Sequence, residues 1–158
     1  MTRVTRNRVL IWVIFLGLAN FVSFTVMYWY LGGDAKNGDY RDGVYYVRGH
    51  HLRHPVVEAG AGQPVSRGVE SPVSRGWWMY SYVHSISIWP TIGAVLVSMF
   101  ILARPHIIAT MKQDAMIRGT TFVTACITVV VLVTGASTLY FVLDFVRALA
   151  IIGQGGAP

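Results

Sequence analysis

The segment Val9–Leu31 reads VLIWVIFLGLANFVSFTVMYWYL and holds no Asp, Glu, Lys or Arg in 23 residues. Two further segments share this property: Trp77–Ala103, with 27 residues, and Gly119–Leu143, with 25. About 20 apolar residues in a helix cross the hydrocarbon core of a bilayer. The three segments therefore predict an all-α integral membrane protein with three transmembrane helices.

The composition agrees with a membrane protein and excludes two other classes. Of the 158 residues, 54% are hydrophobic and only 13% are charged. A soluble domain carries roughly 25% charged residues, and a disordered chain combines low hydrophobicity with high net charge. The three uncharged segments are also too long for the rest of the chain to cover them as a buried core.

The basic residues predict how the spans are oriented. The tail 1–8 holds three Arg and no acidic residue, and the connection 104–118 holds three basic residues and one acid. Because short cytoplasmic segments are enriched in Lys and Arg, we expect both on the cytoplasmic side of a bacterial inner membrane. The loop 32–76 and the tail 144–158 then face the extracytoplasmic side. The net charge of +6 is thereby explained without nucleic acid, because no basic stripe with interleaved aromatic residues occurs.

The loop 32–76 is the largest segment outside the predicted spans. Its nine glycines and the dipeptides Asn37-Gly38 and Asp42-Gly43 are typical of turns. Val44–Arg48 reads VYYVR, a β-type run, and an extended stretch containing Pro55 follows it. We predict a small β-hairpin at 43–57. A hairpin of this size is marginal alone, so it needs a membrane surface or a partner to pack on.

A short repeat closes the loop. The sequence Pro-Val-Ser-Arg-Gly occurs at 64–68 and again at 72–76. Two copies are too few for a solenoid. The repeat is either an extended linker or a strap that lies on a partner subunit, with Arg67 and Arg75 pairing with acidic residues of that subunit.

Histidines supply the candidates for metal and cofactor binding. His50, His51 and His54 are metal candidates because imidazole binds zinc, copper and nickel; the alternative is that they are exposed residues of a turn. His84 lies inside the second span, where an ionisable residue is a functional candidate, and His can bind haem iron. No second His occurs in the other two spans, so a hydrogen bond between helices is the alternative role. The sequence requires no cofactor.

Small and hydroxyl side chains recur every three or four positions in the spans. A period of 3.5 is the seam of a helix pair, and small residues let membrane helices approach closely. We expect internal helix packing or an interface with partner helices. The third span carries Thr121, Thr124, Thr128, Val131, Gly135 and Thr138, the second carries Tyr80, His84, Ser87, Thr91, Ala94 and Ser98, and the first carries Asn20, Ser23, Met27 and Tyr30.

Aromatic and charged residues near the outer ends of the spans have simpler interpretations. Trp77, Trp78 and Tyr82 open the second span and are typical of aromatic belts at the membrane surface. Asp144 and Arg147, three positions apart, are spaced for a local ion pair on a helix.

Three functional hypotheses follow. The first is a non-catalytic accessory or structural subunit of a larger bacterial membrane complex, a class that includes respiratory and photosynthetic electron-transfer assemblies, with the outer loop lying on partner subunits. The second is a stand-alone sensor or a protein that binds a metal or small ligand through the outer loop. The third is a haem- or quinone-binding subunit. No catalytic motif is found, so we do not expect an enzyme.

Overall fold

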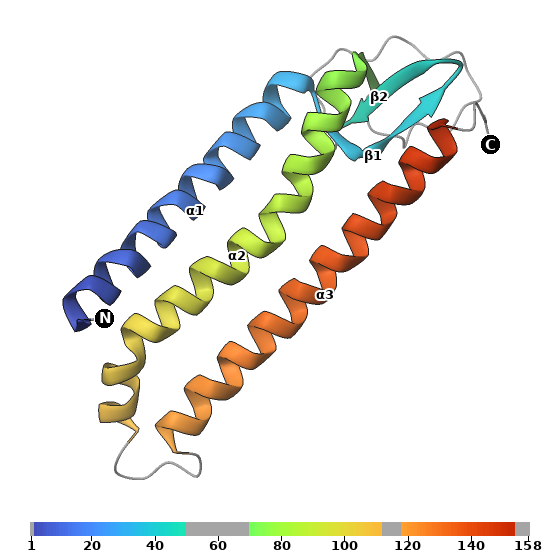
Figure 1. Ribbon diagram of the computed structural model, residues 1–158. Coiled ribbons are helices and arrows are strands. Elements are labelled where there is room, and N and C mark those ends of the chain that lie inside the picture. Colours follow the sequence, from blue (N-terminus) through green and yellow to red (C-terminus); the bar gives the residue numbers. More distant parts are fainter. Residues whose placement is uncertain (1, 50–69, 112–117, 154–158) are drawn as a thin grey trace, which may run out of the picture. The chain divides into compact units, whose positions relative to one another are not determined.

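The computed structural model describes residues 2–49, 70–111 and 118–153 (Figure 1). It contains three helices, α1 (Arg3–Leu31), α2 (Arg75–Thr110) and α3 (Gly119–Gly153), each long and apolar enough to cross a membrane. A three-stranded antiparallel sheet lies between α1 and α2 in the chain. The predicted fold class is confirmed.

The helices extend beyond the predicted spans. α2 continues through Pro90 and Pro105, so residues 104–110 prolong the helix instead of forming a separate connection. α3 continues to Gly153, so most of the predicted tail 144–158 is helical. The absence of charged residues set the predicted bounds, whereas helical hydrogen bonding continues past the first charged side chains.

Contacts within the chain separate two units. Residues 1–23 and 86–142 form one, here called the helical unit, and residues 24–85 and 143–158 form the other, here called the sheet unit. The sheet unit contains the strands together with the C-terminal ends of α1 and α3 and the N-terminal part of α2 (Figure 1).

The strands β1 (Asp34–Arg41), β2 (Val44–Arg48) and β3 (Glu70–Val73) pair in the order β1-β2-β3. Asp42 and Gly43 connect β1 to β2, with φ values of 50° and 81°, as in the two-residue turns that favour Asp-Gly. The strand at 44–48 agrees with the prediction, but the hairpin differs from the one expected at 43–57. β2 pairs with β1 on one edge and with β3 on the other, and residues 51–57 lie outside the described part of the chain.

The second copy of the repeat has a structural explanation. Pro72 and Val73 end β3, an edge strand in which a proline is tolerated. Ser74 then precedes α2, and its Oγ accepts a hydrogen bond from the Trp77 N–H at 3.5 Å, the position of a helix N-cap. Arg75 begins the helix and is exposed. Residues 72–76 therefore form a strand-to-helix connection; the first copy, with Arg67, lies outside the described residues.

The sheet unit has a small hydrophobic core. Val47 of β2 and Ala35 of β1 are 0% and 1% exposed, and Trp78 and Tyr82 of α2 are each 3% exposed. The Trp78 ring contacts the rings of Tyr45, Tyr82 and Phe145. Trp78 and Tyr82 thus pack between the sheet and α3 rather than serving as the predicted membrane-surface anchors. Trp77 remains exposed, as a belt residue should be.

In the helical unit, α2 contacts both other helices. Asn20 of α1 donates from Nδ2 to the Oγ1 of Thr91 at 2.9 Å and to the Oγ of Ser87 at 3.3 Å. Gly93 of α2 faces Thr134 of α3, so closely that a Cβ at Gly93 would lie 2.6 Å from the Thr134 Oγ1. The predicted packing of the stripes of spans one and two is therefore observed at Asn20, Ser87 and Thr91.

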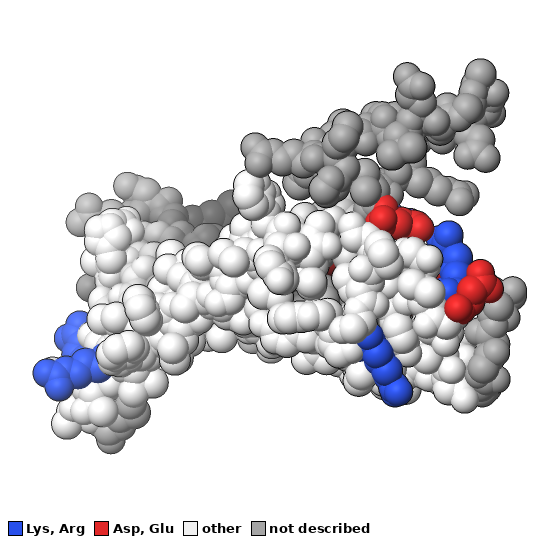
Figure 2. All heavy atoms as spheres, turned by 90° about the horizontal axis from the view of Figure 1, so that it is seen from above, with Lys and Arg blue, Asp and Glu red and all other residues white. Residues whose placement is uncertain are grey.

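Most apolar side chains of the three helices are exposed. In the most apolar 18-residue stretch of α3 no residue is buried, and Leu132 is 65% exposed. On the face seen in Figure 2, acidic side chains lie in one region, basic side chains lie there and also in a second region, and much of the remaining surface is uncharged. Exposed apolar helices of this length indicate contact with lipid.

Candidate functional site: a cavity in the sheet unit

The end of α1 positions the first residues of the site. The Gly33 N–H donates to the Tyr28 carbonyl at 2.9 Å, and Gly32 has a φ of 76°. This combination is a Schellman motif, in which a left-handed residue ends a helix and turns the chain away. The next residue, Asp34, begins β1 directly against α2.

Asp34 is a buried acidic residue that fastens β1 to α2. Asp34 is only 6% exposed. The Asp34 Oδ1 accepts hydrogen bonds from the Ser85 Oγ at 2.5 Å, the Ser81 Oγ at 3.3 Å and the Lys36 N–H at 3.2 Å. The Ala35 N–H donates to the Ser81 Oγ at 3.1 Å. Buried polar groups are usually hydrogen-bonded. These bonds to Ser81 and Ser85 therefore hold the start of β1 against α2.

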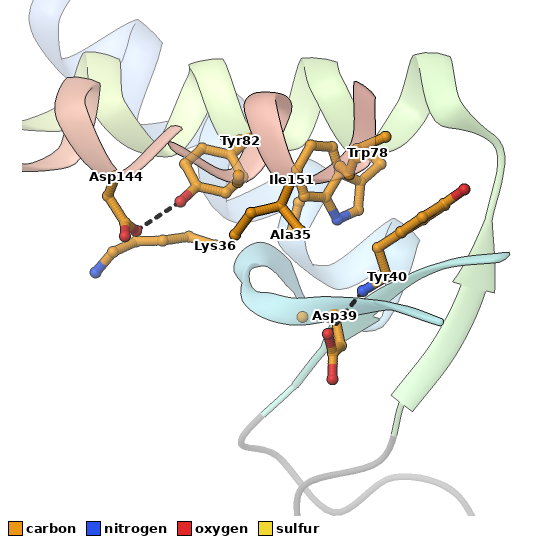
Figure 3. A pocket seen from close by; sticks show the side chains of 11 residues that line it. Ala35, Lys36, Asp39, Tyr40, Trp78, Tyr82, Asp144 and Ile151 are labelled. Carbon is orange, nitrogen blue, oxygen red and sulfur yellow. Dashed lines mark hydrogen bonds between the residues drawn. The ribbon is translucent and has the colours of Figure 1, made fainter. Parts of the chain in front are cut away.

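A cavity of about 340 Å³ lies beside this cluster (Figure 3). Ligand pockets in proteins begin at roughly 300 Å³. One wall comes from β1, another from the aromatic side chains of α2 and the third from the C-terminal end of α3. Its lining residues are Ala35, Lys36, Gly38, Asp39, Tyr40, Trp78, Tyr82, Asp144, Ala148, Ile151 and Ile152.

At the cavity, a hydrogen bond joins α2 to α3. The Tyr82 hydroxyl donates to the Asp144 Oδ2 at 2.7 Å (Figure 3). Asp144 therefore has its partner on another helix, and not Arg147 as the sequence predicted. A carboxylate offers about four acceptor positions, so one phenol leaves most of its capacity for a ligand.

Trp78 brings a buried polar atom, its indole N–H, to the lining of the cavity. Its Nε1 is fully covered and has no hydrogen-bond partner among the described residues. In Figure 3 this nitrogen is turned toward β1, the strand that supplies Lys36 and Tyr40 to the cavity. An unmatched buried donor costs free energy.

Ionic contacts cross the sheet next to the cavity. Asp39 of β1 contacts Arg41 at 2.7 Å, and Glu70 of β3 contacts both Arg41 at 3.3 Å and Arg48 of β2. Partial burial alone would raise the pKa of the Asp39 carboxyl. Hydrogen bonds from Arg41 and the Tyr40 N–H, with the positive charges of Arg41 and Arg48, outweigh burial and lower its pKa below the ordinary value.

The predicted metal and cofactor candidates lie elsewhere. His50, His51 and His54 are outside the described residues. Within the described ranges, no group of three or more His, Cys, Asp or Glu could hold a metal ion. His84 is buried on α2, with its ring edge-on to Phe24 and Tyr80 at 5.6 and 5.4 Å. A cofactor role for His84 stays a prediction.

Part of the predicted α3 stripe, with one residue of the α2 stripe, lines a second hollow, in the helical unit. This groove of about 570 Å³ lies between α2 and α3, and we call it the α2–α3 groove. Four predicted stripe residues line it: Ala94 of α2 with Val131, Gly135 and Thr138 of α3. The complete lining is Pro90, Gly93, Ala94, Val97, Val131, Thr134, Gly135, Thr138, Leu139 and Val142.

The α3 stripe continues along the exposed face of the helix. Thr121, Thr124 and Thr128 are exposed and line a further shallow hollow. Thr134 of α3 packs closely against Gly93 of α2, and the stripe did not include Thr134. The residues of the α2 stripe differ in burial, because Ser98 is buried whereas Tyr80 is 45% exposed. Periodicity identified small residues at regular spacing but not which of two adjacent faces the neighbouring helix covers.

Comparison of the chain with protein-family models, curated proteins and solved structures finds no match in any of the three.

Sequence reasoning missed most of the cavity. Lys36 was not singled out, and Trp78 and Tyr82 were assigned to the membrane surface. The pattern carried one usable signal: Asp42-Gly43 precedes the strand 44–48, so residues 34–41 are the natural partner of a two-residue hairpin. That register would have brought Lys36 and Tyr40 into the sheet.

Proposed function

We propose that this protein is a non-catalytic subunit of a larger membrane complex and that the α2–α3 groove receives a transmembrane helix of a partner subunit. The observation that supports the proposal is that Ala94 of α2 and three stripe residues of α3 line one groove. Ala94 of α2 and Gly135 of α3 are both exposed there, although residues of this kind serve close packing between membrane helices.

The hydroxyl groups near the groove support a helix as its occupant. The Thr134 Oγ1 donates to the Val130 carbonyl and the Thr138 Oγ1 to the Thr134 carbonyl, each at 2.7 Å. Since both hydroxyl groups donate within α3, the groove presents a mainly apolar surface to an approaching helix. In lipid, helix association depends on such close packing because lipid chains are as apolar as the side chains themselves.

A lipid chain is the alternative occupant. Lipid gains no preference from small side chains at a regular spacing, whereas a second helix needs them to approach. The exposed Thr121, Thr124 and Thr128 prolong the same spacing toward the N-terminal end of α3. A contact of that length fits a helix crossing the membrane beside α3.

Gentle solubilisation from the native membrane followed by size exclusion tests the proposal. The wild-type protein should co-migrate with another membrane protein, and Gly135→Leu, which fills the groove, should release it. Met99→Leu, a change on an exposed position of α2 that does not line the groove, is the control and should co-migrate like wild type. A wild-type protein that migrates alone, or only as copies of itself, contradicts the proposal.

The orientation is part of the same proposal. Basic residues at 1–8 and 104–118 support a cytoplasmic N-terminus in a bacterial inner membrane. The sheet unit, which holds the C-terminal end of α3, then faces the extracytoplasmic side. A reporter inserted at Gly62 or fused after Pro158 should be active only outside the cytoplasm. Cytoplasmic activity at Gly62 would reverse the assignment.

A further inference from the structure

We infer that a hollow at one end of the helical unit binds the phosphate group of an anionic phospholipid. This hollow of about 390 Å³ lies where the beginning of α1 runs beside α2 (Figure 1), and we call it the arginine hollow. It shares no lining residue with the α2–α3 groove. Its lining residues are Arg3 and Arg6 of α1 with Ile101, Arg104, Pro105 and Ile108 of α2. Residues far apart in the sequence thus bring three positive charges to one place.

Arg3 and Arg6 lie on the face of α1 that packs against α2. Farther along α1 this face holds Gly17, where a Cβ would overlap the side chain of Val95 on α2. Steps of four and three residues lead back from Gly17 to Arg6 and Arg3, as the helical repeat requires for residues that share a face. Arg8 lies about 200° around the helix from Arg6 and does not line the hollow. Two of the three arginines at the start of the chain are therefore placed toward α2.

No acidic side chain balances these charges in the described part of the chain. Neither α1 nor α2 contains Asp or Glu, and the ion pairs found among the described residues belong to the sheet. Positive charges that lie together disfavour one another, and a shared anion relieves that repulsion. Guanidinium groups present a planar fork of N–H donors that matches the oxygens of a phosphate. The arginine hollow therefore favours a phosphate as its ligand.

The position of the hollow indicates that the phosphate belongs to a lipid. Arg104 directly follows the uncharged segment 77–103, and α2 is long and apolar enough to cross a membrane. Its guanidinium then lies near the level of the lipid headgroups. Ile101 and Ile108 supply apolar surface beside the arginines, which an acyl chain can contact while its phosphate is bound. Basic hollows of this kind between membrane helices suit anionic headgroups, whereas a soluble phosphate has nothing to place on the isoleucines.

The charges also select between headgroups. Phosphatidylglycerol has a phosphate and no positive group, whereas phosphatidylethanolamine adds an ammonium. The described lining holds no carboxylate that could receive an ammonium, and three guanidinium groups repel it. We therefore expect the hollow to prefer phosphatidylglycerol.

Native mass spectrometry of the full chain, released from nanodiscs of equal phosphatidylglycerol and phosphatidylethanolamine, tests the inference. The wild-type protein should retain one phosphatidylglycerol. Arg6→Gln and Arg104→Gln, on different helices, should each lower the retained fraction about ten-fold, because each removes charge-assisted hydrogen bonds. Arg8→Gln removes the same charge from the same end of α1 but outside the hollow, so it is the matched control and should retain the lipid.

Far-ultraviolet circular dichroism separates lipid binding from folding. The side chains of Arg6, Arg8 and Arg104 are all exposed, so the three variants should keep the helix content of wild type. Soluble glycerol phosphate, which shares the phosphate but has no acyl chain, should leave the bound lipid in place. Displacement of the lipid by an equal concentration of glycerol phosphate would overturn the assignment to a membrane lipid.

The inference is overturned if wild type retains both lipids equally, because the arginines would then exert no choice of headgroup. Equal losses in Arg6→Gln and Arg8→Gln would also overturn it, since the charge of the tail would act without the hollow. Asp114 follows α2 in the sequence and lies outside the described residues. Retention of phosphatidylglycerol only after Asp114→Asn would show that a carboxylate of the chain itself takes the place assigned to the phosphate.

Discussion

The Tyr82 hydroxyl lies 2.7 Å from the Asp144 Oδ2, and this hydrogen bond joins α2 to α3 across 62 residues of sequence. Tyr82 is nearly fully buried, and its ring also stacks near Phe145 with centroids 4.8 Å apart. The pair therefore fixes the C-terminal end of α3 beside the aromatic core of the sheet unit and shapes the cavity there.

Removing the Tyr82 hydroxyl should loosen this end of α3. Tyr82→Phe keeps the ring and loses a hydrogen bond to a charged acceptor, which is worth about 1.5–3 kcal/mol when buried. We expect a lower unfolding temperature, measured by near-ultraviolet circular dichroism in detergent. Tyr80→Phe, at a residue 45% exposed, is the control. If Tyr82→Phe remains destabilising to the same extent when Asp144 is also changed to Asn, the hydroxyl does not act through Asp144.

Two glycines provide a matched test of the packing between α2 and α3. A Cβ at Gly93 would lie 2.6 Å from the Thr134 Oγ1, whereas a Cβ at Gly135 would meet nothing within 4 Å. Gly93→Ala should therefore destabilise the protein by about 1–3 kcal/mol through overpacking. Gly135→Ala should be neutral or stabilising by up to about 1 kcal/mol, because alanine favours the helix. Equal unfolding free energies for the two variants in detergent would show that α2 and α3 do not pack at Gly93.

The sheet should lose part of its stability in acid. The pKa of Asp39 is lowered in the folded protein, chiefly because Arg41 outweighs the effect of burial. The resulting stability is complete above the unfolded value of 3.8 and is lost as the pH falls through the lowered folded value. Its size is about 0–1 kcal/mol, since the Asp39 side chain is 42% exposed.

Hydrogen exchange at the β1 and β2 amides between pH 6 and pH 3 measures this contribution. The wild-type protein should lose protection more steeply than Asp39→Asn, after correction for the intrinsic pH dependence of exchange. Parallel curves for the two proteins would mean that Asp39 does not stabilise the hairpin.

The spans were predictable because a long uncharged segment that crosses a membrane must satisfy its backbone hydrogen bonds internally, which a helix does. Val44–Arg48 was predictable from its aromatic and β-branched residues. β1, which reads DAKNGDYR, has little β propensity. It is a strand because the Asp42-Gly43 turn and the Asp34 cluster hold it against β2 and α2. Local composition contains neither constraint.

The cavity was less predictable for a related reason. Trp78 and Tyr82 have the same composition signal whether they face a membrane surface or a protein core. Their burial depends on where β1 and α3 lie, which are contacts distant in sequence. Asp144 has a local candidate partner in Arg147, but the buried phenol of Tyr82 provides the hydrogen bond instead.

The central claim, that a partner helix lies along the α2–α3 groove, is tested most directly by photo-crosslinking in the native membrane. Val131 and Val133 are the same residue type and are each 53% exposed, but they lie about 200° apart around α3, and only Val131 lines the groove. A benzophenone side chain at 131 should crosslink to one membrane protein other than this chain, while the same group at 133 should react with lipid alone. Equal crosslinking from both positions, or crosslinks from 131 to lipid only, would contradict the account.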